Sequence, residues 1–312
     1  MSVHPAGQKT ADQKTEGRTM FLQNAIPAET ADLTTAAGLQ RPGTARPIIE
    51  FERVTVAYGR DAAATQALAE SSFRIDEGDF IALVGPSGCG KSTILKLVAG
   101  LLKASSGHVF VARREVGAED VRIGMAFQNP TLLPWLSIRR NVMLPLKIAH
   151  PFRKDWRQKR HGEYRDRADA LLAKVGLLDF ADKFPWQLSG GMQQRASLCR
   201  ALIHDPTLLL LDEPFGALDQ FTREELWATL QTLWMERRPT VLLVTHDLRE
   251  SAFLANRIMV MSARPGRFLV DEQVDFPRPR TLDTTVQPEF TNLTHALRGL
   301  IVAARSGAGG QS

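Results

Sequence analysis

The chain has 312 residues, of which 44% are hydrophobic and 23% charged, proportions that are ordinary for a globular protein. The sequence holds no apolar run of the roughly eighteen residues needed to span a bilayer. Its polar N-terminus also lacks the apolar core of a secretion signal, so the two cysteines need no disulfide. The net charge of +5 is compatible with an anionic membrane or nucleic acid, but solvated surface charge is the favoured interpretation.

Residues 1–46 are predicted to form a disordered N-terminal tail, because Ala, Thr, Gln and Gly dominate and little hydrophobic periodicity occurs. The main domain is predicted over 47–280. Its first strand begins at Ile48, and the alternation from Val54 to Tyr58 is typical of a half-buried strand.

Short apolar runs predict further strands, several of them buried on both faces as in a parallel sheet. These strands lie at 80–84, 108–112, 123–127, 208–211 and 240–245, and we expect the last two to be neighbours. Helices are predicted over 94–102 and 223–236, and 137–205 is mainly helical. The alternation of strands and helices indicates a mostly parallel α/β sheet with an inserted helical lobe at about 129–205. Residues 281–312 are predicted as a C-terminal helix (287–304) and a loose tail.

A phosphate-binding loop follows the second predicted strand. Its sequence fits the pattern G-x-x-x-x-G-K-[ST], between a strand and a helix. Glycines let backbone amides approach phosphate oxygens, and the helix N-terminus adds positive partial charge. Lys91 would reach the β- and γ-phosphates of ATP, and the Ser92 hydroxyl would bind Mg²⁺. The predicted loop comprises Gly85, Pro86, Ser87, Gly88, Cys89, Gly90, Lys91, Ser92 and Thr93, with Cys89 a packing residue or, alternatively, a redox switch.

An acidic pair directly follows the buried strand 208–211, at the edge where α/β sheets bind ligands. Asp212 is predicted to hold Mg²⁺, directly or through water. Glu213 is predicted to polarise the attacking water as a general base. A helix-capping acid pair is the alternative, and the phosphate loop favours the catalytic interpretation.

Several further motifs, in order, resemble those of ATP-binding-cassette (ABC) ATPases over residues 48–275. The run Leu188–Arg195 is similar to the family's signature motif. The resemblance implies an ABC cassette of the P-loop NTPase class, with a mostly parallel sheet core, an antiparallel β part and the helical lobe. It also assigns roles to single residues, and for Tyr58 a plain strand aromatic is the alternative. Tyr58 would stack on adenine, Gln128 would contact metal and water, Ser189, Gly190 and Gly191 would bind phosphate, Asp219 would belong to the D-loop, and His246 would sense the γ-phosphate.

The resemblance also implies partners. Two copies would form a head-to-tail dimer in which the phosphate loop of one copy and the Ser189 segment of the other enclose each ATP. Closure on ATP would drive membrane permease subunits that work with a solute-binding protein. The ATPase would then lie on the cytoplasmic face of the inner membrane as a peripheral protein, and we expect no nucleic-acid partner. An apolar segment, Pro130–Leu136, is predicted to contact the permease or to form a small core of the lobe.

The runs Leu132–Ser137 and Ser262–Arg267 resemble importers of nitrate, sulfonates and taurine. An importer ATPase for another small organic solute is the first alternative. A soluble ABC ATPase acting on nucleic acid or ribosomes is the second. It is disfavoured because the chain holds one cassette and because Lys91 and Ser189 are too close for an intervening coiled coil.

The basic stretch 151–168 is predicted to be a solvated helix face or, alternatively, a contact to membrane phosphates.

Overall fold

The computed structural model describes residues 46–59, 65–116 and 121–306. All of the predicted N-terminal tail except Arg46 lies outside the described residues, as do the last residues of the predicted C-terminal tail. Among the described residues, none of the helices is both long enough and apolar enough to cross a membrane.

An antiparallel sheet of four strands, sheet A, opens the domain. Its spatial order is β2-β1-β4-β5. Register shifts within the β1–β2 pairing, such as the one between Phe51 and Val54, mark irregular positions in the long first strand. The strands are β1 (Pro47–Tyr58), β2 (Thr65–Asp76), β4 (Ser106–Val111) and β5 (Arg114–Glu115).

Sheet B has six strands in the order β10-β9-β3-β8-β7-β6, and every neighbouring pair is parallel except β9 with β10. The predicted adjacency of 208–211 and 240–245 is confirmed by the pairing of β7 with β8. The sequence analysis did not predict β9 or β10. The strands are β3 (Phe80–Val84), β6 (Ile123–Ala126), β7 (Leu208–Asp212), β8 (Thr240–Val244), β9 (Arg257–Met261) and β10 (Phe268–Gln273).

The first helix, α1 (Lys91–Val98), starts three residues earlier and stops four residues earlier than the predicted 94–102. It starts directly at the phosphate loop because Gly90, with φ of 103°, turns the chain into it. It ends because Gly100 takes the left-handed conformation, with φ of 69°, so Leu102 packs against the core without continuing the helix.

The segment predicted as mainly helical consists of short helices, and the helices predicted over 223–236 and 287–304 are confirmed as α6 and α8. The α-helices after α1 are α2 (Ile138–Ile148), α3 (Trp156–Lys159), α4 (Glu163–Lys174), α5 (Gly190–Leu202), α6 (Gln220–Arg237), α7 (Leu248–Leu254) and α8 (Pro288–Ser306). Single 3₁₀ turns occur at Phe152–Lys154, Leu178–Phe180, Pro185–Gln187 and Leu282–Val286.

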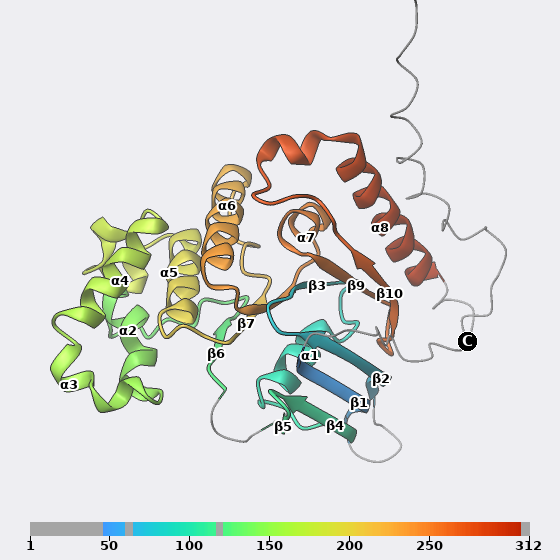
Figure 1. Ribbon diagram of the computed structural model, residues 1–312, viewed down its shortest axis with the longest axis horizontal. Coiled ribbons are helices and arrows are strands. Elements are labelled where there is room, and N and C mark those ends of the chain that lie inside the picture. The colour runs from blue at the N-terminus through green and yellow to red at the C-terminus, as the bar shows by residue number, and fades with distance from the viewer. Residues whose placement is uncertain (1–45, 60–64, 117–120, 307–312) are drawn as a thin grey trace, which may run out of the picture. The chain divides into compact units, whose positions relative to one another are not determined.

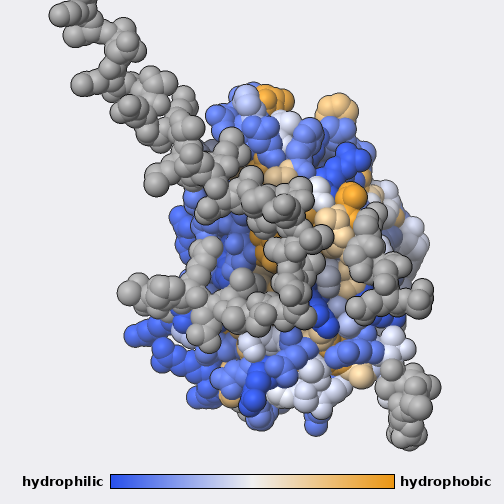
Figure 2. Space-filling view, turned by 90° about the vertical axis from the view of Figure 1, so that its right-hand side faces the viewer, coloured by the Kyte–Doolittle hydropathy of each residue, from blue (hydrophilic) through white to orange (hydrophobic). Residues whose placement is uncertain are grey.

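Sheet B separates two hydrophobic cores (Figure 1). Because side chains alternate along a strand, Ile81 and Leu83 face the core shared with α1 and sheet A, whereas Ala82 and Val84 face the core shared with the other helices. Because both faces of the central strands are buried, their residues are almost wholly apolar. Packing on both faces also holds the C-terminal ends of these strands in place. On the face seen in Figure 2, hydrophilic residues predominate in the lower part, and apolar ones lie mainly in the upper half.

The basic stretch 151–168 is partly tied into the helical lobe. Lys159 pairs with Glu163, and Arg167 pairs with Asp205. Tyr164 is buried between these charges. These ion pairs leave fewer cations available for an external phosphate, which favours the solvated-face interpretation.

Candidate nucleotide-binding site

A polar cavity of about 520 Å³ lies at the C-terminal ends of β3, β7 and β8. Among the residues that line it are Ser87, Gly88 and 90–93 of the phosphate loop, together with Tyr58, Gln128, Glu213 and His246. Residues from five separated parts of the sequence therefore meet at one edge of the sheet, where parallel α/β sheets bind ligands.

The phosphate loop takes a backbone path that needs glycine. Gly88 and Gly90 have φ of 74° and 103°, a region that residues with a Cβ rarely adopt. The Lys91 ammonium is buried and donates to the carbonyl oxygens of Gly85 and Pro86, at 2.9 Å each. These bonds curl the loop around the lysine, so that its cation lies where an anionic phosphate would be bound.

A second loop, Ser262–Arg267 between β9 and β10, braces the phosphate loop from outside. The Gly266 amide donates to the Ala67 carbonyl at 3.0 Å, and the Gly266 carbonyl accepts from Ala69 at 2.9 Å. A Cβ at Gly266 would lie 1.9 Å from the Cys89 carbonyl oxygen, so only glycine allows this approach. The Cys89 side chain is fully buried, which favours its interpretation as a packing residue.

Asp212 ends β7 and accepts a hydrogen bond from the Ser92 hydroxyl at 3.0 Å. Burial raises the pKa of Asp212 above its ordinary value, the Ser92 bond lowers it, and the neighbouring Glu213 carboxylate raises it further. A hydroxyl and a carboxylate in contact beside a phosphate loop form an oxygen donor set of the kind that suits a hard divalent cation.

Glu213 is held toward the cavity by a strained backbone, with φ of 46°, and by its amide, which donates to Val244 at 2.9 Å. Its carboxylate accepts from the Gln128 amide at 3.2 Å and lies 3.4 Å from Nδ1 of His246. Left-handed backbone costs a non-glycine residue roughly 1–3 kcal/mol and is concentrated at functional sites. The structure thus joins the predicted base, the predicted glutamine and the predicted histidine in one cluster.

Tyr58 lies at the cavity wall with 43% of its surface exposed. Its hydroxyl hydrogen-bonds the Thr93 hydroxyl at 3.1 Å, which fixes the ring next to the start of α1. An exposed ring face in this position is available for a nucleobase to stack on.

The remaining predicted residues lie elsewhere: of the described residues that line this cavity, none is Ser189, Gly190, Gly191 or Asp219. Ser189 caps α5 by accepting from the Met192 amide at 3.3 Å, and Asp219 caps α6 by accepting from the Thr222 amide at 3.0 Å. The backbone amide of Thr222 lowers the pKa of Asp219 below its ordinary value. Ser189 and Asp219 are exposed, so both helix starts are open to an outside ligand or partner.

Sequence reasoning missed one charged residue of the cavity. Arg264, from the loop between β9 and β10, lines the cavity, and its Nε donates to the Gly88 carbonyl at 3.4 Å. The two residues are 176 positions apart, and no local motif signals the contact.

Comparison with known proteins gives a consistent result. The family model described as ABC transporter matches residues 68–216. A putative ATP-binding protein of Brucella abortus is 43% identical over 78% of this chain and 90% of its own length. An aliphatic sulfonates import ATP-binding protein of Bacillus licheniformis is 40% identical over 72% of this chain and 85% of its own length.

Among solved structures, the dimeric ATP-binding cassette MJ0796 in a post-hydrolysis state bound to ADP and phosphate is similar, with 33% identity and a TM-score of 0.65. The likeness covers 73% of this chain and all of the cassette. The chain therefore belongs to the ABC transporter ATP-binding proteins, and is an ATPase that binds ATP.

Proposed function

We propose that this ATPase energises an importer of aliphatic sulfonates or similar small anions such as nitrate and taurine. The relatives named as aliphatic sulfonate import proteins support this substrate class, and 47% identity over 215 residues links the chain to one such protein of Paraburkholderia xenovorans. The transported solute itself would be selected by other subunits.

The observation that carries the proposed chemistry is the cluster around the Glu213 carboxylate, at the mouth of the phosphate loop. Glu213 would accept a proton from the water that attacks the γ-phosphate. His246 would donate a hydrogen bond to a γ-phosphate oxygen, and Gln128 would orient the water. Lys91 would neutralise charge that develops on the β- and γ-phosphates.

The Ser92 hydroxyl, the Asp212 carboxylate and the Gln128 side chain fit Mg²⁺, which prefers oxygen ligands. The described residues contain no cluster of three or more His, Cys, Asp or Glu side chains able to hold a metal. Mg²⁺ keeps waters and nucleotide phosphates as ligands and needs one or two carboxylates from the protein. When bound, the ion would neutralise negative charge on the nucleotide phosphates.

We further propose that two chains form a head-to-tail dimer. The exposed start of α5, which begins at Ser189, would bind the γ-phosphate held by the other copy's phosphate loop. Asp219 would lie at the same interface. The dimeric form of the MJ0796 cassette supports this arrangement.

The permease would bind the helical lobe near Pro130–Leu136. Trp135 in this segment is 68% exposed, whereas Leu132 packs against the core and anchors the segment. The ATPase would thereby be held on the cytoplasmic face of the inner membrane as a peripheral protein, next to the permease and its solute-binding protein.

Deletion of this gene from its source organism tests the substrate class. Growth with ethanesulfonate as the sulfur source should be lost and growth with sulfate retained, and a copy carrying Lys91→Ala should not restore it. Unchanged growth on ethanesulfonate would reject the sulfonate assignment, and recovery of the chain with ribosomes instead of membranes would reject the importer.

A further inference from the structure

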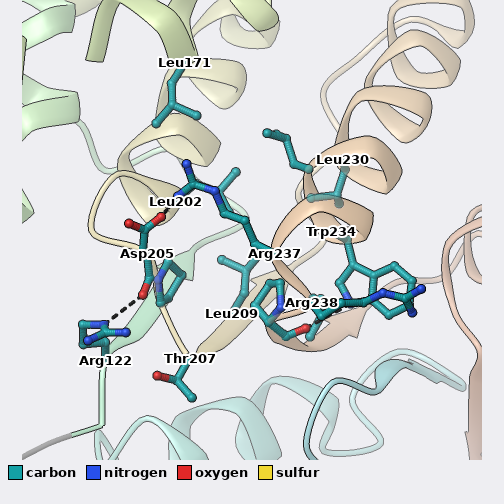
Figure 3. Close-up of a pocket in the computed structure, with 14 residues that line it drawn as sticks. Arg122, Leu171, Leu202, Asp205, Thr207, Leu209, Leu230, Trp234, Arg237 and Arg238 are labelled. Carbon is teal, nitrogen blue, oxygen red and sulfur yellow. Dashed lines mark hydrogen bonds and ion pairs between the residues drawn. The ribbon is translucent and has the colours of Figure 1, made fainter. Parts of the chain in front are cut away.

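A second cavity, of about 500 Å³, opens at the opposite edge of sheet B from the nucleotide site. It lies where β6, β7 and β8 begin, whereas Asp212 and the phosphate loop lie where the strands end. Figure 3 shows the side chains of α5 and α6 converging above these strand starts. The volume is within the range of about 300–1,000 Å³ that is usual for small-molecule sites.

The inner wall of this cavity is apolar. Leu202 from α5, Leu209 from β7 and Leu230 from α6 are among the residues that form it (Figure 3). Leu209 and Leu230 are buried, whereas Leu202 is partly exposed. Such a surface suits the hydrocarbon part of a ligand.

The rim of the cavity is cationic. Three arginines line it, Arg122, Arg237 and Arg238, against one carboxylate, that of Asp205. Asp205 is already engaged, because its side chain forms ion pairs with Arg237 and with Arg167 behind it. The Asp205 carbonyl also accepts from Nε of Arg122 at 2.9 Å.

Two of these arginines have distinct surroundings. Burial lowers the pKa of Arg237 below its ordinary value, and the charge of Arg167 lowers it further. Arg238 stacks on Trp234, with its guanidinium carbon 4.3 Å from the ring centroid. Figure 3 shows both arginines at the cavity, Arg237 beside Asp205 and Arg238 along the Trp234 ring.

Arg237 and Arg238 also lie at the C-terminus of α6, where a cation gains roughly 0.3–1 kcal/mol from the helix dipole. That interaction explains a cation at the helix end. It does not explain an apolar-walled cavity to which Arg122, just before β6, adds a further cation.

We propose that this cavity is a binding site for a small organic anion. The acidic head, a sulfonate, carboxylate or phosphate, would lie at the arginine-lined rim, and an aliphatic or aromatic body would lie against the partly exposed Leu202 and the apolar lining around it. The site is separate from the nucleotide cavity and does not depend on which solute is transported.

Isothermal titration calorimetry on the full-length chain tests the proposal, with 1-hexanesulfonate as the probe. Saturating ADP should be present so that the phosphate loop does not bind the sulfonate. Hexan-1-ol, which lacks the acidic head, and sulfate, which lacks the body, are the comparison ligands. Hexanesulfonate should bind saturably and at least about tenfold more tightly than either.

Two variants should weaken this binding. Thr207 is exposed and lines the cavity, so Thr207→Glu adds a carboxylate near the arginines. The hydrogen bonds of Thr207 are made by its backbone and do not depend on its side chain. Arg238→Gln removes a cation while shortening the side chain only slightly. Each should raise the dissociation constant by about tenfold or more, since a charged hydrogen bond is worth roughly 1.5–3 kcal/mol.

Thr232→Glu is the matched control, because Thr232 is exposed on α6 and does not line the cavity. It should bind hexanesulfonate as the unmodified chain does, and all variants should retain ADP binding as a test of folding. Absence of saturable binding, equal affinity in the Thr207→Glu variant, or equally tight binding of sulfate would each overturn the proposal.

Discussion

The two helix starts expected to contact the nucleotide, those of α1 and α5, differ in what surrounds them. The start of α1 lies inside the cavity, beside buried Lys91 and the Ser92–Asp212 hydrogen bond. The start of α5 is exposed, and the hydroxyl of Ser189 only caps its own helix. One chain therefore contains a cavity built around the start of α1 and, apart from that cavity, a second helix start that is exposed.

The largest expected effect comes from the α1 side. Glu213→Gln removes the proposed base but keeps the size of the side chain and the phosphate loop. Turnover should fall by roughly 10²- to 10⁴-fold because general-base assistance is lost. Steady-state phosphate release measures turnover, and retained ATP binding controls for folding. Phosphate release at the unmodified rate would show that Glu213 is not the base.

A second test addresses the α5 side. Ser189→Arg places bulk at the exposed helix start, and turnover should fall about 10²-fold if this start completes a partner's site. Ser137→Arg is the matched control, because Ser137 caps α2 through the same kind of bond to Arg140. Each change costs roughly 1 kcal/mol of capping. Similar turnover in the two variants would mean that Ser189 acts only as a cap.

The bracing of the phosphate loop can be disturbed without touching its sequence. Gly266→Ala brings a Cβ within 1.9 Å of the Cys89 carbonyl oxygen and should displace the loop. ATP affinity should fall about tenfold, measured by equilibrium titration. Gly162→Ala is the control, since a Cβ there meets nothing within 4 Å. Equal affinities would show that the loop between β9 and β10 does not hold the phosphate loop in place.

Arg264→Gln should have a smaller effect, a few-fold loss of ATP affinity that diminishes at high salt, because Arg264 is exposed at the cavity and its charge is screened. Arg267→Gln, in the same loop but not lining the cavity, should leave the affinity unchanged. If both variants lose ATP affinity equally, the loss reflects the lower net charge of the protein and not the position of Arg264 at the cavity.

The smallest effect concerns stability. Glu250 is buried in α7, and burial, together with the Asp247 carboxylate, raises its pKa well above the ordinary value. Protonated Glu250 therefore makes its full contribution to stability when the pH is below the pKa that Glu250 has in the unfolded chain. This contribution is lost as pH rises through the pKa that Glu250 has in the folded chain.

As pH rises, the free energy of unfolding of the Glu250→Gln variant should therefore increase relative to that of the unmodified chain. Between the pKa values that Glu250 has in the unfolded and folded chain, the increase should be at most about 1.4 kcal/mol per pH unit. Urea unfolding at several pH values measures the difference. Exposed Glu225→Gln is the control and should change stability by less than about 0.5 kcal/mol. A gain that does not grow with pH would show that Glu250 is ionised in the fold without penalty.

The sequence predicted the parts of the site that are local in the chain. The phosphate loop, Asp212 and Glu213 each follow a short apolar strand. A strand that is buried on both faces is easy to recognise in a sequence, because nearly all of its residues are apolar. β2 was not predicted because it pairs through irregular register and mixes small residues with polar ones. Arg264 and Gly266 were not assigned to the site because their contacts arise only when β9 pairs beside β3.

The mass of the Glu213→Gln chain in solution, measured by light scattering with and without ATP, tests the shared site most directly. One chain has a mass of 34.5 kDa. The account predicts this mass without ATP, about twice it with ATP and Mg²⁺, and the single mass again when Ser189→Arg is added. A single-chain mass for the Glu213→Gln protein while ATP is bound would contradict the shared site.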